Sequence, residues 1–150
     1  MVDDSARVAA LRPLVQRYLK EAFGSYYTDE DGDYVIPYAD VRVHVIPRAW
    51  TEVPDLRSGE PRTYTVVLVC AWINRGMRVD AELAEFIATE NCNLLFGRLS
   101  LDPERRTVRL DNNLLGDYLN FEELAVAVAC VAKEAEHYGE LIAARFGGSR

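Results

Sequence analysis

Histidine and cysteine, the side chains most often used for nucleophilic catalysis and metal binding, are few and widely separated in this chain. The histidines are His44 and His137, and the cysteines are Cys70, Cys92 and Cys130. No Cys-x-x-Cys or His-x-x-His spacing for zinc is present, and no nucleophile lies in a recognisable elbow. A triad can assemble from distant positions, so a Cys–His or Ser–His pair stays open. The pattern favours solvated or surface-paired histidines, with no catalytic residue and no metal site.

An acidic run at residues 29–33, Asp-Glu-Asp-Gly-Asp, is the segment most similar to a calcium loop. The ligand positions of such a loop that flank the run are occupied by Tyr27 and Tyr38, so the ligand set is incomplete. The Asp31-Gly32 pair instead predicts a hairpin turn. No glycine-rich phosphate loop is present, and Gly97, alone in a predicted strand, indicates a bulge or close packing. No cofactor is expected.

The composition predicts a globular protein with one domain over residues 1–150, because 49% of its residues are hydrophobic. There are 24 acidic and 17 basic residues, and the net charge of −7 disfavours binding to nucleic acid or to an anionic membrane. The longest apolar run, Val66 to Ile73, is too short to span a bilayer. The start of the chain, Met1 to Ser5, lacks the apolar core of a secretory signal. With an odd number of cysteines, these features predict a reduced, cytoplasmic protein.

Hydrophobic periodicity predicts an α+β fold with the order α-β-β-β-α-β-β-α and an antiparallel sheet. The first helix is expected to end at Phe23 before Gly24, and either to start near Pro13 or to kink there. A short additional strand at 25–28 stays open. The other strands are predicted at Tyr34–Pro37, Val41–Val45, Thr63–Ile73, Leu94–Leu101 and Arg106–Asp111, with a loop from Pro47 to Pro61. Since Val66 to Ile73 is apolar on both faces, that strand is predicted to be central and covered on both sides.

Two further helices carry clear start signals. Asp80 is the expected N-cap of a helix that ends near Asn91, and Asn120 is the expected N-cap of the last helix, which ends at Gly147.

The last helix and the strands carry more apolar surface than one sheet face requires. Residues 124–132 contain no charged side chain, and Trp50 and Trp72 lie near or within strands, as do Tyr34 and Tyr38. A helix that rests on one sheet face needs an apolar stripe rather than an apolar girdle. Either neighbouring elements of the same chain cover this surface, or a second polypeptide covers part of it.

The scaffold motifs resemble a known family. The segment Glu90-Asn91-Cys92-Asn93-Leu94-Leu95-Phe96-Gly97 leads into Phe-Gly-Arg-Leu-Ser-Leu-Asp at 96–102, followed by Val-Arg-Leu-Asp at 108–111 and by Asn-Phe-Glu-Glu-Leu at 120–124. Together with the element order, these motifs resemble the YbjN family and the related actinobacterial peptide-binding chaperone domains. That group is similar in fold to the class I type III secretion chaperones of the CesT kind. The resemblance implies a two-layer fold and a non-enzymatic, homodimeric protein that holds an extended peptide without nucleotide or metal.

The resulting hypothesis is a cytoplasmic chaperone or adaptor that binds a peptide or partner protein through apolar sheet and loop surface. The predicted contact residues are Val43, Val45, Trp50 and Trp72, and the predicted homodimer contacts are Phe86 and Ile87 in the second helix. Ordinary core packing is the alternative for each of these six residues. The alternative function is a YbjN-like regulatory or stress-related protein that acts by partner contact or ligand sensing without client-chaperone activity.

Overall fold

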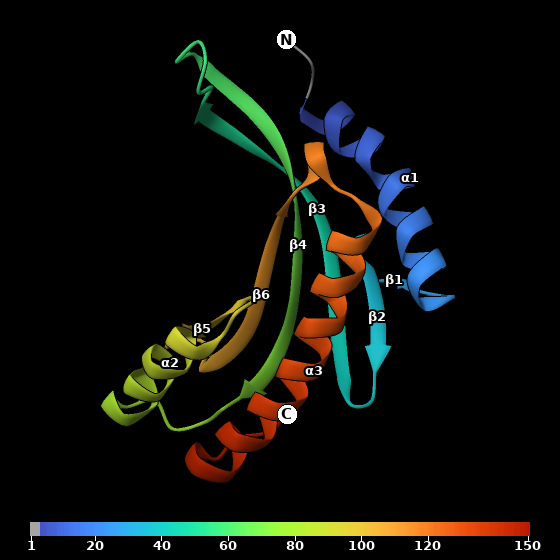
Figure 1. Ribbon diagram of the computed structural model, residues 1–150. Coiled ribbons are helices and arrows are strands. Elements are labelled where there is room, and N and C mark those ends of the chain that lie inside the picture. Colours follow the sequence, from blue (N-terminus) through green and yellow to red (C-terminus); the bar gives the residue numbers. More distant parts are fainter. Residues whose placement is uncertain (1–3) are drawn as a thin grey trace.

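The computed structural model describes residues 4–150, which form three α-helices, a six-stranded sheet and one 3-10 turn (Figure 1). In chain order the elements are α1 (Asp4–Phe23), β1 (Tyr27–Thr28), β2 (Tyr34–Tyr38), β3 (Val41–Pro54), β4 (Pro61–Arg75), α2 (Ala81–Asn93), β5 (Arg98–Asp102), β6 (Thr107–Leu115), the 3-10 turn η1 (Gly116–Tyr118) and α3 (Phe121–Phe146). The predicted α+β class and element order are confirmed, and the additional short strand is present as β1.

The strands form one antiparallel sheet in the order β1-β2-β3-β4-β6-β5. The register places Val35, His44, Cys70, Asp111 and Arg98 in one row across five strands. Since side chains alternate along a strand, this row and the next one point to opposite faces of the sheet.

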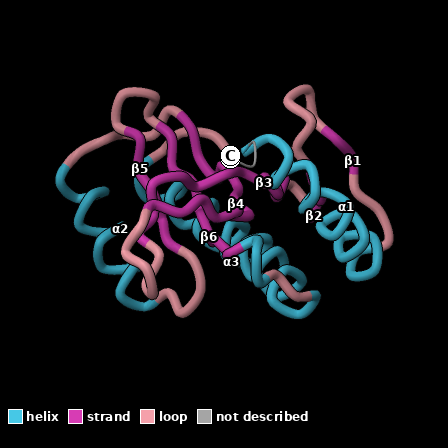
Figure 2. Tube along the Cα trace, turned by 90° about the horizontal axis from the view of Figure 1, so that it is seen from above, coloured by secondary structure: helices cyan, strands magenta, loops and turns pink. Residues whose placement is uncertain are grey.

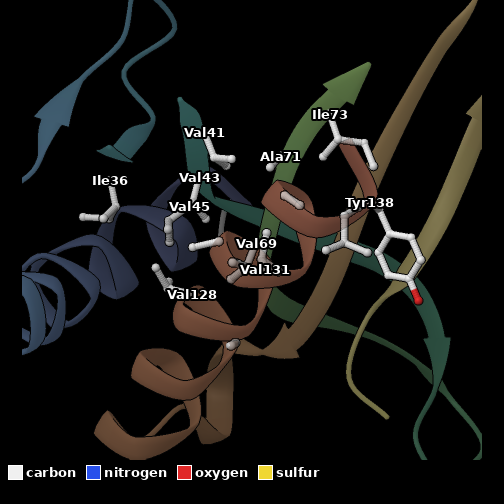
Figure 3. Packing of buried hydrophobic residues seen from close by; sticks show 14 of the residues in the cluster. Ile36, Val41, Val43, Val45, Val69, Ala71, Ile73, Val128, Val131 and Tyr138 are labelled. Atoms are coloured by element: carbon white, nitrogen blue, oxygen red, sulfur yellow. The ribbon is translucent and has the colours of Figure 1, made fainter. Parts of the chain in front are cut away.

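All three helices lie on one face of the sheet. From above, α1 lies beside β2 and α2 beside β5, at opposite ends of the sheet's width (Figure 2). Alternate valines of β3 and β4 form the core with the apolar stripe of α3, and Val128 and Val131 of α3 face Val45 and Val69 (Figure 3). Two layers thus enclose a single buried cluster.

The helix boundaries follow the predicted signals. The carboxylate of Asp80 accepts a hydrogen bond from the Leu83 N–H at 3.0 Å, and the Asn120 side chain accepts one from the Glu123 N–H at 2.9 Å. Gly24 has φ +77° and its N–H bonds to the Lys20 carbonyl, which ends α1. These caps satisfy backbone groups that helix ends otherwise leave without partners.

The predicted loop from Pro47 to Pro61 is wrong in most of its length. β3 continues to Pro54 and β4 begins at Pro61, so the two strands form a hairpin arm that projects beyond the rest of the sheet (Figure 1). Pro47 lies beyond Val45, the last β3 residue paired with β2, and an edge strand tolerates a missing N–H. Local turn signals suggested a loop, whereas pairing between the two strands keeps the segment extended.

Two other boundaries differ from the prediction. α1 begins at Asp4 and includes Pro13, so of the two predicted alternatives at Pro13 the start of the helix is excluded. Residues 94–97 lie outside β5, which begins at Arg98, and α2 extends to Asn93. Gly97 has φ +89°, and a Cβ there would lie 2.9 Å from the Asp111 carbonyl oxygen. The predicted close packing at Gly97 is therefore confirmed, and the glycine ends the turn before β5.

The apolar segment 124–132 of α3 is mostly covered within the chain. Leu124, Val128 and Val131 are buried, whereas Val126 remains half exposed on the flank of the helix. None of the helices within residues 4–150 is long and apolar enough to cross a membrane.

Candidate partner-binding surface

The sheet face opposite the helices, which we call the open face, has no helix over it within residues 4–150. Core valines of β3 and β4 point to the helices, so the residues that alternate with them point away. The open face comprises Arg42, His44, Ile46, Arg48 and Trp50 of β3, Tyr64, Val66, Leu68, Cys70 and Trp72 of β4, and Arg109, Asp111, Asn113 and Leu115 of β6. It combines an apolar strip near the arm with a charged region around Trp72.

Trp72 is the centre of the charged region. Its side chain is 40% exposed, and its ring packs edge-on against the His44 ring, with centroids 5.2 Å apart. The Arg109 guanidinium lies 5.7 Å from the indole centroid, within the range of a cation–π contact. The indole separates two hollows. One has a volume of about 330 Å³ and is lined by Asp40, Arg42, His44, Trp72 and Arg75, and the other, of about 280 Å³, lies towards Ser100 and Arg105.

Within this surface, the buried carboxylate of Asp111 organises an ion cluster with two exposed arginines. Asp111 is 3% exposed, and its carboxylate accepts a hydrogen bond from the Ser100 hydroxyl at 2.7 Å. Arg109 approaches the same carboxylate at 2.5 Å, and Arg98 approaches it at 3.9 Å. A buried carboxylate requires such partners, because desolvation without them is costly. The cluster fixes the position of the Arg109 side chain beside Trp72.

The acidic run at 29–33 forms the predicted turn and supports the open face from one end. The Asp29 carboxylate accepts the N–H groups of Asp31 and Asp33 at 3.0 and 2.9 Å, and these bonds, with the His44 contact, lower the pKa of Asp29. Nδ1 of His44 lies 3.3 Å from the same carboxylate. The predicted surface pairing of His44 is thereby confirmed, and the ring is oriented towards Trp72.

The predicted contact residues separate into two pairs. Trp50 and Trp72 lie on the open face with exposed fractions of 52% and 40%. Val43 and Val45 point to the helices and have no exposed surface, so the structure places their side chains in the core. The alternation of side chains along a strand predicts that His44 lies on the opposite sheet face from Val43 and Val45. The sequence does not show which of the two faces the helices cover.

The predicted dimer contacts in α2 mostly pack within the protomer. Ile87 is buried, and the Phe86 ring packs against Phe146 with centroids 5.6 Å apart. Exposed apolar side chains lie instead just after α2, where Leu95 is 87% exposed and Phe96 is half exposed. The exposure of Leu95 and Phe96 was missed because residues 94–97 were predicted to lie in a strand.

At the outer edge of β5, the backbone of Leu99 is paired with the side chain of Asn91, which belongs to the motif at 90–97. The Asn91 amide donates to the Leu99 carbonyl at 3.0 Å and accepts the Leu99 N–H at 2.7 Å. Both bonds occupy backbone groups of an edge strand that would otherwise be free to pair with another strand. Asn91 therefore protects the Leu99 position of this edge from pairing with another strand.

A third hollow lies on the side of the molecule where α1 ends. It has a volume of about 430 Å³ and is lined mainly by apolar side chains, among them Phe23, Ile36, Tyr38 and Val128. Pro37 also lines it and interrupts hydrogen bonding along β2.

The thiol of the open face, Cys70, has low reactivity. Burial raises the pKa of the Cys70 thiol to about 11, which keeps it protonated and a poor nucleophile at neutral pH. All three cysteines are free thiols. Among the described residues, no group of three or more His, Cys, Asp or Glu side chains is arranged to hold a metal ion. The arrangement is suited to noncovalent contact through an indole, arginines and an apolar strip.

Similar folds occur in several solved complexes. A chain in the crystal structure of the ExsC–ExsE complex matches with 20% identity and a TM-score of 0.58, covering 86% of this chain and 93% of that one. A chain in the HopA1–SchA chaperone–effector complex matches with 11% identity and a TM-score of 0.59, covering 93% and 99%. A chain in the complex of the Yersinia pestis type III secretion chaperone SycH with a fragment of YscM2 matches with 15% identity and a TM-score of 0.53, covering 85% and 98%. At these identities the likeness shows the fold alone.

Comparison with curated proteins finds no significant sequence match. A family model described as "T3SS (YopN, CesT) and YbjN peptide-binding chaperone 1" matches residues 9–150. This match covers nearly the whole chain and includes the motifs at 90–102, 108–111 and 120–124 on which the resemblance was based. The chain therefore belongs to the family of peptide-binding chaperones related to YbjN and to the type III secretion chaperones.

Proposed function

We propose that this protein is a non-enzymatic chaperone or adaptor that binds an extended segment of a partner protein on its open face. The observation that carries the proposal is the exposed indole of Trp72, which contacts His44 and Arg109 on the sheet face that no described helix covers. Exposed aromatic side chains in a prearranged setting are typical binding hot spots. The protein is proposed to act in the cytoplasm, in keeping with its three free thiols.

The apolar strip of the open face supports the same proposal. Trp50 of β3 is half exposed at the base of the arm, and Leu115 is exposed on β6, with β4 between the two strands. With Trp72, these side chains give one sheet face apolar positions along its length. An extended segment that runs across the strands can place alternate side chains on them. Val43 and Val45 have a core role in this proposal.

The test uses Trp72 as its own reporter. In a Trp50→Phe variant, Trp72 is the single tryptophan of the chain. The partner is first identified by purification of the tagged protein from its native host and by mass spectrometry, and peptides that span the partner are then titrated into the variant. A bound segment is expected to shift the Trp72 emission to shorter wavelength and to reduce its quenching by acrylamide, because the indole leaves water.

A matched pair of substitutions locates the contact. Trp72→Ala is expected to weaken binding of the same peptide at least tenfold, as measured by calorimetry. Leu141→Ala is the control, because Leu141 is 41% exposed but lies on α3. Unchanged Trp72 emission on saturation with a bound peptide would refute the open face as the site. Equal losses in the two variants would refute it as well.

We further propose that the protein is a homodimer whose interface includes the end of α2. The exposed side chains of Leu95 and Phe96 follow directly after α2, and the partly accessible Phe86 lies in the same helix. Ile87 has a supporting role here, because its burial holds α2 against the core. Consecutive exposed apolar side chains are typical of protein–protein contacts.

Light scattering on the intact protein tests this interface. The expected mass is twice 16.9 kDa for the wild type and 16.9 kDa for a Phe96→Asp variant. Leu56→Asp is the control, since Leu56 is almost fully exposed at the tip of the arm. A monomeric wild type would exclude the dimer. Dissociation by Leu56→Asp with retention of the dimer in Phe96→Asp would place the interface on the arm.

A further inference from the structure

The charges without partners around Trp72 are mainly positive. Arg42 and Arg75 line the same hollow as the indole, and neither guanidinium makes an ion pair or hydrogen bond within residues 4–150. Asp40 is the one carboxylate that lines this hollow. His44 is engaged with Asp29 outside it. An approaching ligand thus meets two free guanidinium groups and one free carboxylate.

The neighbouring ion cluster adds to this positive character. Asp111 is the shared partner of Arg98 and Arg109, so one buried carboxylate faces two guanidinium groups. On the other side of the indole, Asp102 and Arg105 pair with each other at 3.0 Å and cancel. With Asp29 beside His44 included, five guanidinium groups face four carboxylates around Trp72, so this region has a small excess of positive charge although the whole chain has a net charge of −7.

We propose that the segment bound on the open face is acidic, with Asp or Glu side chains placed near an apolar side chain. This inference rests on the proposed function and specifies its ligand. The carboxylates contact Arg42 and Arg75, for which the structure holds no other partner, while the apolar side chain covers Trp72. In an extended peptide, residues i and i+2 point to the same side about 7 Å apart, so both kinds of contact are available to one short segment.

The alternative polyanion, a single-stranded nucleic acid, fits the surface less well. Arginines beside an exposed indole do suit phosphates and bases. A phosphodiester chain, however, carries one charge per nucleotide along its length, and the overall charge of −7 repels it beyond the local patch. A peptide with a few carboxylates avoids most of that repulsion.

Three fluorescein-labelled 12-residue peptides test the inference by fluorescence anisotropy on the intact protein. They share the same Phe and Ile residues and differ at four positions, which carry Glu, Gln or Lys. We expect the Glu peptide to bind about five- to tenfold more tightly than the Gln peptide at 50 mM NaCl and the Lys peptide to bind most weakly. The advantage of Glu over Gln is expected to shrink at 300 mM NaCl, because salt screens exposed charges.

A double variant assigns the effect to the two free arginines. Arg42→Gln with Arg75→Gln is expected to raise the dissociation constant of the Glu peptide about five- to tenfold and to leave that of the Gln peptide unchanged. Lys20→Gln with Arg57→Gln removes the same charge at the end of α1 and at the arm tip, and is expected to change neither. Circular dichroism confirms that both double variants are folded.

The outcomes separate this inference from the proposed function. Equal binding of the Glu and Gln peptides, with loss of both in Trp72→Ala, would overturn the acidic ligand and keep the open face as a binding site. Binding of none of the three peptides would overturn the inference, while the Trp72 emission experiment with partner peptides decides the function separately. Tighter binding of a (dT)12 oligonucleotide than of the Glu peptide would overturn it in favour of a nucleic acid.

Discussion

Substitution of Asn91 by Ala should destabilise the protein more than is usual for a residue that is not part of the core. The Asn91 amide makes two hydrogen bonds to Leu99 of β5, at 2.7 and 3.0 Å, and Leu99 is only 3% exposed. Each lost hydrogen bond costs about 1 kcal/mol, and buried backbone groups left without partners add to that cost. We therefore expect the free energy of unfolding to fall by about 2–4 kcal/mol. With an m-value of about 2 kcal/mol/M, the urea midpoint falls by about 1–2 M.

Asn93→Ala is the matched control. Asn93 lies in the same last turn of α2 and is exposed, and its side chain makes no hydrogen bond within the described residues. Both substitutions replace Asn with a better helix former, so the propensity gain is present in each variant. Urea unfolding followed by circular dichroism measures both. If Asn91→Ala and Asn93→Ala unfold within about 0.5 kcal/mol of each other, the closing of the β5 edge by Asn91 contributes little, and the reasoning is wrong.

Three other predictions concern the core and the titratable groups. Val45→Ala should lower the free energy of unfolding by about 2 kcal/mol in urea titrations and leave peptide affinity unchanged, because the side chain has no exposed surface. Burial and the hydrogen bond to Glu90 raise the pKa of Tyr138 to about 12 in the folded state, from 10. The folded protein thus keeps this proton longer than the unfolded chain, so its contribution to stability is complete below pH 10 and is lost as the pH rises from 10 to 12; Tyr138→Phe should flatten this part of a urea-midpoint profile. Cys70 should react with iodoacetamide at pH 8 far more slowly than the exposed Cys92, as measured by mass spectrometry of the digested protein, and equal rates would contradict the burial of Cys70.

The exposed tryptophans answer a question that the apolar surplus of the sequence left open. Much of that surplus is internal, since Tyr34 and most of the segment 124–132 are buried within the chain. Trp50 and Trp72, in contrast, remain 52% and 40% exposed, and both lie on the open face. In a single protomer both tryptophan side chains are therefore partly exposed to solvent. This exposure is the reason to expect a second polypeptide on the open face.

The arm shows the limit of local turn signals. The segment contains four residues that favour loops, and these predict a loop: Pro47, Pro54, Gly59 and Pro61. In the structure, Ala49 pairs with Thr65 and Trp50 with Tyr64, so the strands continue through most of this segment. A strand partner 14 to 16 residues away supplies the hydrogen bonds, and this information is not present in either strand alone.

Residue patterns read along the chain were enough for the order of the helices and strands, because the signals for these are local. Asp80 and Asn120 cap the helices that follow them by accepting hydrogen bonds from residues three positions later in the chain. Alternation along β3 places Val43 and Val45 on one face of the sheet and His44 on the other. Which side of the sheet is covered was settled only by packing. The apolar run from Val66 to Ile73 predicted a central strand covered on both sides; β4 is central, but the helices lie over one side only. The burial of the valines, the exposure of Trp72 and the free arginines beside it depend on how distant segments come together, which no stretch of neighbouring residues specifies.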